Sequence, residues 1–290
     1  MRWPVLWLNN YNSAAEPFFT RHGLTPSMDL GLRGKVAVVA AASQGLGRAA
    51  AFAFAREGCK VAICARTAAP LEDTAKAIRK ETGADVLAAP ADVSRPDGVK
   101  AFLDGAVQSF GGIDIVVPNA GGPPTGGFET LAEEQWTRGW ELTFQSTVRL
   151  VRSSLPAMRK RGGGAVVAIL SMSVRQPIDN LVLSNALRLG VVGALKTLAR
   201  EVAKDRIRVN AVAPGWIATD RTIELARVRA EREGRPLEDV QAATLQDIPL
   251  GRFGKPEEVG DLIAYLASER AAYITGVIAQ IDGGLYRGIF

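Results

Sequence analysis

Histidine is almost absent from this chain of 290 residues, in which His22 is the single example. A triad of serine, histidine and aspartate would therefore require His22 to fold into a site from the N-terminal end of the chain. Zinc sites made from several histidines are excluded, and two cysteines are too few for a cysteine-rich metal site. Chemistry in this protein must use hydroxyls, carboxylates, arginine, lysine or a bound cofactor, and we expect no metal.

Two cysteines are also too few for a disulfide framework. Cys59 and Cys64 are separated by four residues within one apolar segment, so on a strand their side chains point to opposite faces. They cannot form a bond to each other there. We interpret both as small, buried hydrophobic residues.

Long hydrophobic runs are missing as well. No run approaches about 18 apolar residues, the length that indicates a membrane-spanning helix. The run Pro4–Leu8 near the beginning of the chain is too short for the core of a signal peptide. These features predict a soluble, cytoplasmic protein without a membrane partner.

Basic residues exceed acidic residues, which gives the chain a net charge of +5. The basic residues are scattered, and their densest cluster, Arg159–Arg161, directly precedes three glycines. Cations followed by glycine are typical of the C-terminus of a helix. We therefore expect no nucleic-acid partner, whereas a mildly basic surface suits an anionic ligand.

One domain is expected, preceded by an extension. Residues 1–28 lack sustained periodicity and are predicted to be disordered or to pack on a neighbour, and a start site placed too early explains them equally well. Residues 29–290 carry the regular pattern. Within them, residues 221–249 are charged and helical, which is typical of an inserted lid.

From residue 35 onward, short apolar segments alternate with helical ones. Fully apolar strands that alternate with helices indicate a parallel sheet covered on both faces. We therefore predict an α/β fold, a Rossmann-like doubly wound sheet of about seven strands with a ligand crevice at the carboxyl ends of the strands. The expected strands are Lys35–Ala40, Lys60–Cys64, Asp85–Ala88, Ile113–Val117, Ala165–Leu170, Ile207–Val212 and Val277–Ile281. The expected helices are Arg48–Arg56, Pro70–Lys80, Pro96–Phe110, Leu131–Arg161, Leu183–Lys204 and one that begins at Pro256.

A glycine-containing turn, Ala41–Gly47, connects the first strand to its helix. Gly45 and Gly47 allow the backbone to approach a diphosphate, and the helix N-terminus offers free N–H groups. Glycines also simply turn chains, but this position in an alternating chain favours nucleotide binding. The glycine-rich loop Gly121–Phe128 follows the fourth strand and is expected to open onto the same crevice.

The turn resembles that of the short-chain dehydrogenase/reductase family, which reads TGxxxGxG, although Ala40 and Ala41 replace its Thr and first Gly. The resemblance extends from Lys35 to Gly284 and is greatest to 3-oxoacyl-(acyl carrier protein) reductases. The segments that carry it are Asp92-Val93, Pro118–Gly121 (NNAG in the family), Arg208–Asp220, Pro249–Gly254 and Ile281–Gly284. The resemblance implies that the cofactor is bound by Ser43, Gln44, Gly45, Leu46, Gly47, Arg66, Asp92, Val93, Asn119, Ala120, Gly121, Arg188, Pro214, Gly215, Ile217 and Thr219.

Charge at the end of the second strand indicates which cofactor is bound. An NAD enzyme places Asp or Glu there to bind the ribose 2′-hydroxyl. Here the segment Cys64–Thr67 contains Arg66, and no acid occurs before Glu72. Arg66 would pair with a 2′-phosphate that a carboxylate would repel. We therefore expect NADP(H) rather than NAD(H).

The positions that correspond to the family's catalytic residues are altered. The family uses a Tyr and a Lys spaced YxxxK, with a Ser thirteen residues before the Tyr and an Asn on the preceding long helix. In this sequence the Tyr position is Ser184, the Lys position is Arg188 and the Asn position is Thr143, while Ser171 keeps the family's Ser. Tyr11, Tyr265, Tyr273 and Tyr286 do not have the spacing of the missing Tyr.

These replacements change the expected chemistry. A serine hydroxyl is far less acidic than a tyrosine, whose pKa is about 10, and arginine does not relay protons. We hypothesise that Ser171 and Arg188 polarise a carbonyl by hydrogen bonding, while water or the substrate supplies the proton. Ser173 is an alternative to Ser171. Ser184 as a merely small residue and Arg188 as a surface or ribose-binding residue are also open interpretations.

We predict an NADP(H)-dependent oxidoreductase that reduces a small-molecule carbonyl substrate. Two alternatives stay open: an NADP(H)-binding module or sensor without redox turnover, and a non-redox lyase or isomerase on the same scaffold. The resemblance implies a homo-oligomer, either a tetramer or a dimer. The substrate is not encoded in any readable motif of residues 221–249.

Overall fold

The computed structural model describes residues 28–289 of the chain. The predicted extension therefore lies outside the described residues except for Met28, and so do His22 and Tyr11. Asp29 and Leu30 attach the beginning of the described part to the 3-10 turn Glu269–Ala271. The Arg270 guanidinium donates to the Asp29 carbonyl at 2.8 Å, and the Glu269 N–H donates to the Leu30 carbonyl at 3.1 Å.

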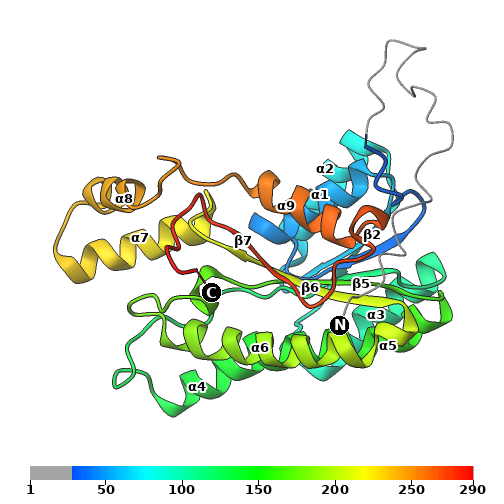
Figure 1. Ribbon diagram of the computed structural model, residues 1–290, viewed down its shortest axis with the longest axis horizontal. Coiled ribbons are helices and arrows are strands. Elements are labelled where there is room, and N and C mark those ends of the chain that lie inside the picture. The colour runs from blue at the N-terminus through cyan, green and yellow to red at the C-terminus, as the bar shows by residue number, and fades with distance from the viewer. Residues whose placement is uncertain (1–27, 290) are drawn as a thin grey trace, which may run out of the picture.

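Seven strands form one parallel sheet with the order β3-β2-β1-β4-β5-β6-β7 (Figure 1). This order confirms the predicted doubly wound fold, because the chain winds outward in one direction from β1 to β3 and in the other from β4 to β7. The strands are β1 (Val36–Val39), β2 (Lys60–Ala65), β3 (Val86–Pro90), β4 (Ile115–Val117), β5 (Gly164–Ile169), β6 (Ile207–Pro214) and β7 (Ile278–Ile281).

Helices cover both faces of the sheet, with α1, α2 and α9 on one side and α3, α5 and α6 on the other (Figure 1). Alternate residues of each strand point to opposite layers, so Val38 and Val39 belong to different hydrophobic clusters. The helices are α1 (Gly45–Arg56), α2 (Ala68–Thr82), α3 (Pro96–Phe110), α4 (Glu133–Gly139), α5 (Ser146–Lys160), α6 (Val182–Glu201), α7 (Asp220–Glu233), α8 (Leu237–Gln246) and α9 (Pro256–Ala267).

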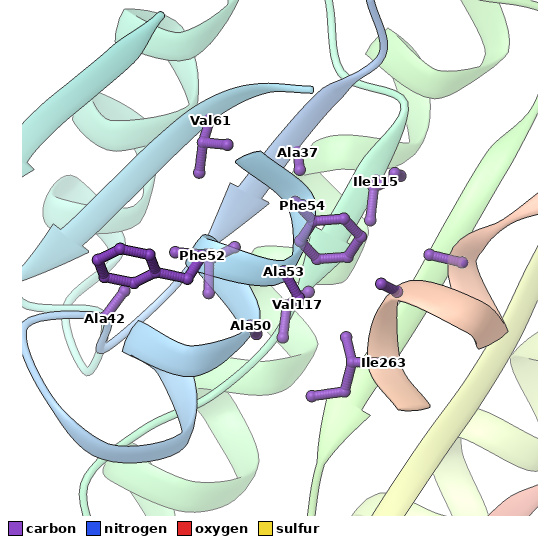
Figure 2. Packing of buried hydrophobic residues seen from close by; sticks show 14 of the residues in the cluster. Ala37, Ala42, Ala50, Phe52, Ala53, Phe54, Val61, Ile115, Val117 and Ile263 are labelled. Carbon is purple, nitrogen blue, oxygen red and sulfur yellow. The ribbon is translucent and has the colours of Figure 1, made fainter. Parts of the chain in front are cut away.

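The layer containing α1 is packed with small side chains around Phe54. Figure 2 shows Phe54 lying over Ala37, Ile115 and Val117 of the sheet, with Ile263 of α9 beside it. Phe54 and Ile263 are completely buried. This close packing of α1 and α9 on the sheet fixes where the N-terminus of α1 meets the ligand crevice.

The two cysteines lie in the opposite layers, as their spacing predicts. Cys59 belongs to the cluster under α1 and Cys64 to the cluster under α3, and both thiols are free. Burial raises the pKa of each thiol to about 12. They are therefore small hydrophobic residues of the core, which confirms the interpretation from the sequence.

The predicted long helix Leu131–Arg161 is present with an internal irregularity. Its middle section, η1 (Trp140–Gln145), is a π-helix between α4 and α5. A π-helix has one more residue per hydrogen-bonded turn than an α-helix and often marks a functional site. Hydrophobic periodicity predicts the helix but not this local widening, which contains Thr143.

The segment 221–249 forms the helices α7 and α8, which confirms its predicted helical character. The pair extends from the carboxyl end of β6 beyond the edge of the sheet (Figure 1). Gly234, with a φ of 62°, ends α7 and allows the chain to turn into α8.

Among the described residues, one helix, α6, is long and apolar enough to cross a membrane by length and composition. This is weak evidence, because the core helix of a soluble protein has the same properties. One face of α6 packs against the sheet through Val191, Leu195 and Ala199, which are buried. We therefore interpret α6 as a helix of the doubly wound fold.

Candidate functional site

The carboxyl ends of β1, β2, β4, β5 and β6 surround a cavity of about 760 Å³. Of the residues predicted for the site, Gly47 and Thr143 do not line this cavity. The predicted residues that do line it are Ser43, Gln44, Gly45, Leu46, Arg66, Asp92, Val93, Asn119, Ala120, Gly121, Ser171, Ser184, Arg188, Pro214, Gly215, Ile217 and Thr219.

The glycine turn brings the backbone close to this cavity. Gly45 begins α1 with a φ of 58°, and the Gln44 side chain makes no capping hydrogen bond, so the first N–H groups of α1 face the cavity without a side-chain cap. A Cβ atom on Gly47 would lie 2.4 Å from the carbonyl oxygen of Ala41. Gly47 therefore packs beneath the turn rather than lining the cavity. Free N–H groups at a helix N-terminus form a site for a phosphate group.

Ala41 has the left-handed backbone conformation that the family's glycine would adopt, with a φ of 49°. Asn119 supports this strained point, because its Nδ2 donates to the carbonyl oxygens of Ala40 at 3.3 Å and Ala41 at 3.4 Å. The Thr74 hydroxyl donates to the Ser43 carbonyl at 2.9 Å and attaches the turn to α2. The turn is thus held from two sides.

Arg66 lies exposed on the cavity wall at the end of β2. It faces Asp92, whose Oδ1 accepts hydrogen bonds from the Ser94 hydroxyl at 2.7 Å and the Ser94 N–H at 3.0 Å. Partial burial raises the pKa of Asp92, but the bonds from Ser94 and the charges of Arg66 and Arg95 outweigh this and lower it overall. Asp92 is therefore a charged acceptor already engaged by Ser94, whereas Arg66 lines the cavity and makes no side-chain hydrogen bond within residues 28–289.

Three serines meet near the end of β5. The Ser173 and Ser184 hydroxyls are 3.2 Å apart and both residues are buried. Ser171 lines the cavity, and its Oγ accepts a hydrogen bond from the Ser173 N–H at 3.1 Å. Spacing predicts Ser171 as the functional serine, while the structure shows that Ser173 is the serine paired with Ser184.

Arg188 extends from α6 into the wall of the cavity. Its Nη1 donates to the carbonyl oxygens of Ile169 at 3.0 Å and Leu170 at 3.2 Å, while its Nε is buried without a hydrogen-bond partner. Burial and, to a smaller extent, the neighbouring charge of Arg221 lower the pKa of Arg188 to about 10. Arg188 remains a cation at neutral pH and can donate hydrogen bonds to an oxygen in the cavity.

Thr143 lies away from the cavity, in η1, with 5% of its surface exposed. Within residues 28–289 its hydroxyl has no hydrogen-bond partner, although its carbonyl accepts the Thr147 hydroxyl at 3.1 Å. The structure therefore does not bring Thr143 into contact with the other predicted catalytic residues. Among the described tyrosines, Tyr265, Tyr273 and Tyr286, none lines the cavity.

A second cavity of about 700 Å³ lies beneath α7 and α8. Much of its wall is apolar and includes Val240 and Phe253. It adjoins the first cavity through residues that line both, namely Met172, Ile178, Leu181, Trp216, Thr219, Asp220, Thr222 and Leu225. A ligand in the first cavity can therefore extend beneath α7 and α8.

Arg221 belongs to the first cavity and was not among the residues predicted from the sequence. Its Nη2 donates to the Pro123 carbonyl at 3.2 Å, which joins α7 to the loop after β4. Its position directly after the matched segment Arg208–Asp220 was the only signal in the sequence. The contact with Pro123 depends on the tertiary fold, so spacing alone could not identify it.

Within the described residues, no group of three His, Cys, Asp or Glu side chains could hold a metal ion. The chemical groups that line the cavity are hydroxyls, amides and guanidiniums, together with a few carboxylates such as Asp92, Asp220 and Glu224. This set suits hydrogen bonding to an anionic or carbonyl-containing ligand.

A protein-family model described as enoyl-(acyl carrier protein) reductase matches residues 40–286. The chain is 36% identical over 260 residues to the 3-oxoacyl-(acyl-carrier-protein) reductase FabG of Vibrio cholerae, covering 89% of this chain and 99% of the relative. The corresponding protein of Escherichia coli is 34% identical over 257 residues, with the same coverage.

Solved structures with this fold include enzymes that bind a nicotinamide cofactor. L-sorbose reductase from Gluconobacter frateurii, complexed with NADPH and L-sorbose, is 37% identical with a TM-score of 0.86, covering 90% of this chain and 100% of that chain. An actinorhodin polyketide ketoreductase variant with NADPH is 31% identical with a TM-score of 0.84, covering 88% of this chain and 98% of that chain.

Proposed function

Because the chain belongs to the short-chain dehydrogenase/reductase family, we propose that it is an NADP(H)-dependent oxidoreductase that reduces a carbonyl substrate at a non-standard serine and arginine site. The family itself is defined by oxidoreductases, so the coarse assignment follows from membership. The observation that carries the specific proposal is Arg188, a buried cation that lines the cavity and bonds to the carbonyl oxygens of Ile169 and Leu170, next to Ser171.

The residues around the glycine turn fit NADP(H). The N-terminus of α1 would hold the diphosphate. Gly47, which lacks a Cβ, allows the Ala41 carbonyl of the turn to lie close to α1. Arg66 would pair with the 2′-phosphate, because no acid at the end of β2 repels that group. Two of the solved relatives described above were crystallised with NADPH, which supports the same choice.

The remaining residues act on the substrate carbonyl. When bound, NADPH supplies a hydride that joins the carbonyl carbon. The C=O electron pair then moves to the oxygen, where Ser171 and Arg188 donate hydrogen bonds to the developing negative charge. Water gives this oxygen a proton and becomes hydroxide, so the products are the alcohol, NADP⁺ and hydroxide.

Proton transfer by the chain itself has little support. Ser184 is bound to Ser173, and a serine hydroxyl is a weak acid. Arg188 retains its proton at neutral pH and cannot act as a base. We therefore expect carbonyl reduction to be favoured over alcohol oxidation, which needs a base to remove the hydroxyl proton.

A cofactor-binding module without redox turnover is the second candidate. Two observations favour it. The Ser184 hydroxyl is paired with the Ser173 hydroxyl, and none of the described tyrosines lines the cavity. The retained glycine turn is compatible with both candidates. Turnover therefore has to be measured separately from cofactor binding.

The experiment combines cofactor titration with turnover. NADPH and NADH are titrated by fluorescence, and NADPH consumption is then followed with L-sorbose, acetoacetyl thioesters and oxo acids. We expect NADPH to bind more tightly than NADH and at least one carbonyl compound to be reduced. Tight binding with no turnover across the panel would support the module instead.

Two serine variants test whether Ser171 donates a hydrogen bond to the carbonyl oxygen. Ser171→Ala should lower the reduction rate by about 10²- to 10³-fold, as the loss of a donor to an oxyanion does. Ser153→Ala is the matched control, because Ser153 is exposed on α5 away from the cavity. NADP-dependent alcohol oxidation that survives unchanged in Ser171→Ala would contradict this role of Ser171.

We further propose a cytoplasmic homo-oligomer. The free, buried cysteines suit a reducing compartment. Leu189 on α6 and Trp140 of η1 are 54% and 39% exposed, which leaves apolar surface on the side of the molecule formed by these helices. Light scattering of the purified protein should therefore give a dimer or tetramer mass, and a monomer at micromolar concentration would contradict this.

A further inference from the structure

Arg188 is a buried cation to which the described chain offers no carboxylate. A guanidinium has five N–H donors. Nη1 bonds to the carbonyl oxygens of Ile169 and Leu170, whereas neither Nε nor Nη2 makes a hydrogen bond within residues 28–289. A buried charge that lacks a partner is costly, so an anion from outside the chain would be bound favourably here.

Arg221 brings a second positive charge to the same end of the cavity. Its charge acts on Arg188, and both residues line the cavity wall. Arg221 is held in place by its bond to Pro123 and by an ion pair with Glu224 at 3.0 Å. It also packs closely on Gly122, where a Cβ atom would lie 2.6 Å from its Nε.

The cofactor diphosphate does not account for both arginines. The diphosphate position is the N-terminus of α1, which follows β1, whereas Arg188 contacts the end of β5. With β4 between them in the sheet order, these strands are separated by two spacings, or about 9.5 Å. Arg188 therefore lies at the reacting end, beside Ser171, and Arg221 lies within reach of its charge.

We propose that the substrate carries a carboxylate that is held between Arg188 and Arg221, so that the substrate class is the 2-oxo and 3-oxo acids. In such an acid the carboxylate lies one or two bonds from the carbonyl carbon, which lets Arg188 contact the carbonyl oxygen while the carboxylate reaches toward Arg221. The remainder of the molecule extends beneath the lid along Ile178, Leu181 and Trp216. This inference rests on the proposed carbonyl reduction.

A matched pair of substrates tests the carboxylate directly. Benzoylformate and its methyl ester contain the same carbonyl but differ in charge. We expect kcat/KM for the acid to exceed that for the ester by at least about tenfold, the value of one charge-assisted hydrogen bond. Arg221→Gln should reduce the acid-to-ester ratio toward one, whereas Arg227→Gln, exposed on the same helix and outside the cavity, should leave the ratio unchanged.

A binding measurement separates this inference from the proposed function. Oxamate, an unreactive carboxylate, is titrated calorimetrically into the NADP⁺-loaded protein, with neutral oxamide as the control. Binding of oxamate but not oxamide, lost in Arg221→Gln, supports the carboxylate site even if no carbonyl compound is reduced. Reduction of acid and ester at equal rates, or no binding of oxamate, would overturn the site while leaving carbonyl reduction intact.

The same variant identifies the other possible partner of Arg221. A tenfold weaker binding of NADPH to Arg221→Gln, with an unchanged acid-to-ester ratio, would show that Arg221 binds the cofactor diphosphate and would overturn the inference. Thermal unfolding of each variant establishes that the protein remains folded in these measurements.

Discussion

The two halves of the cavity differ in how completely their polar groups are paired. In the half around the glycine turn, Asn119, Thr74 and Ser94 each fix a neighbouring backbone or carboxylate group through hydrogen bonds. In the half around β5 and α6, the Arg188 Nε is buried and has no hydrogen-bond partner within the described residues. The framework of the first half is thus fixed by hydrogen bonds, whereas the second contains a buried cation whose hydrogen bonds are incomplete within the described residues.

This difference separates binding from chemistry within one cavity. Family membership favours the nucleotide half, because Gly45, Arg66 and Asp92, which were predicted from the sequence, line the cavity there. It supports the reacting half less, because Ser184 and Arg188 have different chemistry from tyrosine and lysine. Variants that affect one half and spare the other can therefore test the division.

The largest expected effect is on the reacting half. Arg188→Met should lower carbonyl reduction by about 10²- to 10³-fold, because the developing oxyanion loses its cationic donor. NADPH affinity should fall by no more than about tenfold, since one charge-assisted bond to the ribose is lost. Steady-state NADPH consumption and a fluorescence titration measure the two quantities on the same preparation.

Arg200→Met on the exposed side of α6 is the matched control for this variant. It removes a charge from the same helix without touching the cavity. Equal losses of turnover and NADPH affinity in Arg188→Met would break the comparison, because they would show that Arg188 serves the nucleotide half.

The next effect belongs to the nucleotide half. Arg66→Ala should weaken NADPH binding by about 10- to 100-fold, because the 2′-phosphate loses a charged partner. NADH binding should change little, since NADH lacks that phosphate. Fluorescence titration of both cofactors gives the ratio, and Arg138→Ala, exposed on α4, is the control. Equal weakening of NADH binding would contradict the role of Arg66.

The nucleotide half could largely be predicted from the sequence, because its signals are local. Gly45 lies within the turn that it shapes, and Arg66 follows the second strand directly. Periodicity likewise predicts the alternation of strands and helices, and Pro96–Phe110 has its predicted bounds as α3. Local patterns of this kind depend on backbone conformation, which neighbouring residues determine.

The reacting half depends on contacts between distant segments, which spacing does not predict. The Ser173–Ser184 pair joins η2 (Met172–Val174) to α6, and Arg221 reaches Pro123 across 98 positions of the chain. The π-helix that contains Thr143 has the same hydrophobic pattern as an α-helix. Pattern therefore identifies which residues are candidates here, but only the tertiary structure shows which of them meet.

A smaller effect is expected from a change near the segment Trp216–Ala218, which should affect cofactor binding and turnover equally. That segment pairs with Gly254, and the loop before α9 is held by Glu258, which accepts bonds from Arg252 at 2.6 Å and from the Lys255 N–H at 2.7 Å. These bonds lower the pKa of Glu258 from 4.5 to about 2, with Arg252 as the larger cause.

Glu258→Gln should therefore lower the melting temperature at neutral pH and affect cofactor binding and turnover alike. A carboxyl group whose pKa is lowered by folding stabilises the protein above its ordinary pKa, and this contribution is lost as the pH falls toward about 2. The difference in melting temperature from the unaltered protein should thus shrink below pH 4.5. Glu257→Gln, exposed on the same turn of α9, should show no such pH dependence.

The smallest effect concerns Ala41, the one departure from the family pattern at a strained point of the nucleotide half. A φ of 49° costs an L-residue about 1–2 kcal/mol, which glycine avoids. Glycine also adds about 0.4–1 kcal/mol of conformational entropy to the unfolded chain. Ala41→Gly should therefore raise the free energy of unfolding by up to about 1 kcal/mol, measured by urea denaturation.

Ala42→Gly is the control, because Ala42 is buried beside Ala41 without a positive φ. That variant should lose about 0.5–1 kcal/mol, since glycine gains nothing at an ordinary backbone position. Changes of opposite sign in the free energy of unfolding at these adjacent alanines would show that Ala41 introduces backbone strain into the turn without altering its chemistry. Equal destabilisation at both positions would mean that the surroundings of Ala41 favour alanine over glycine at this position of the turn.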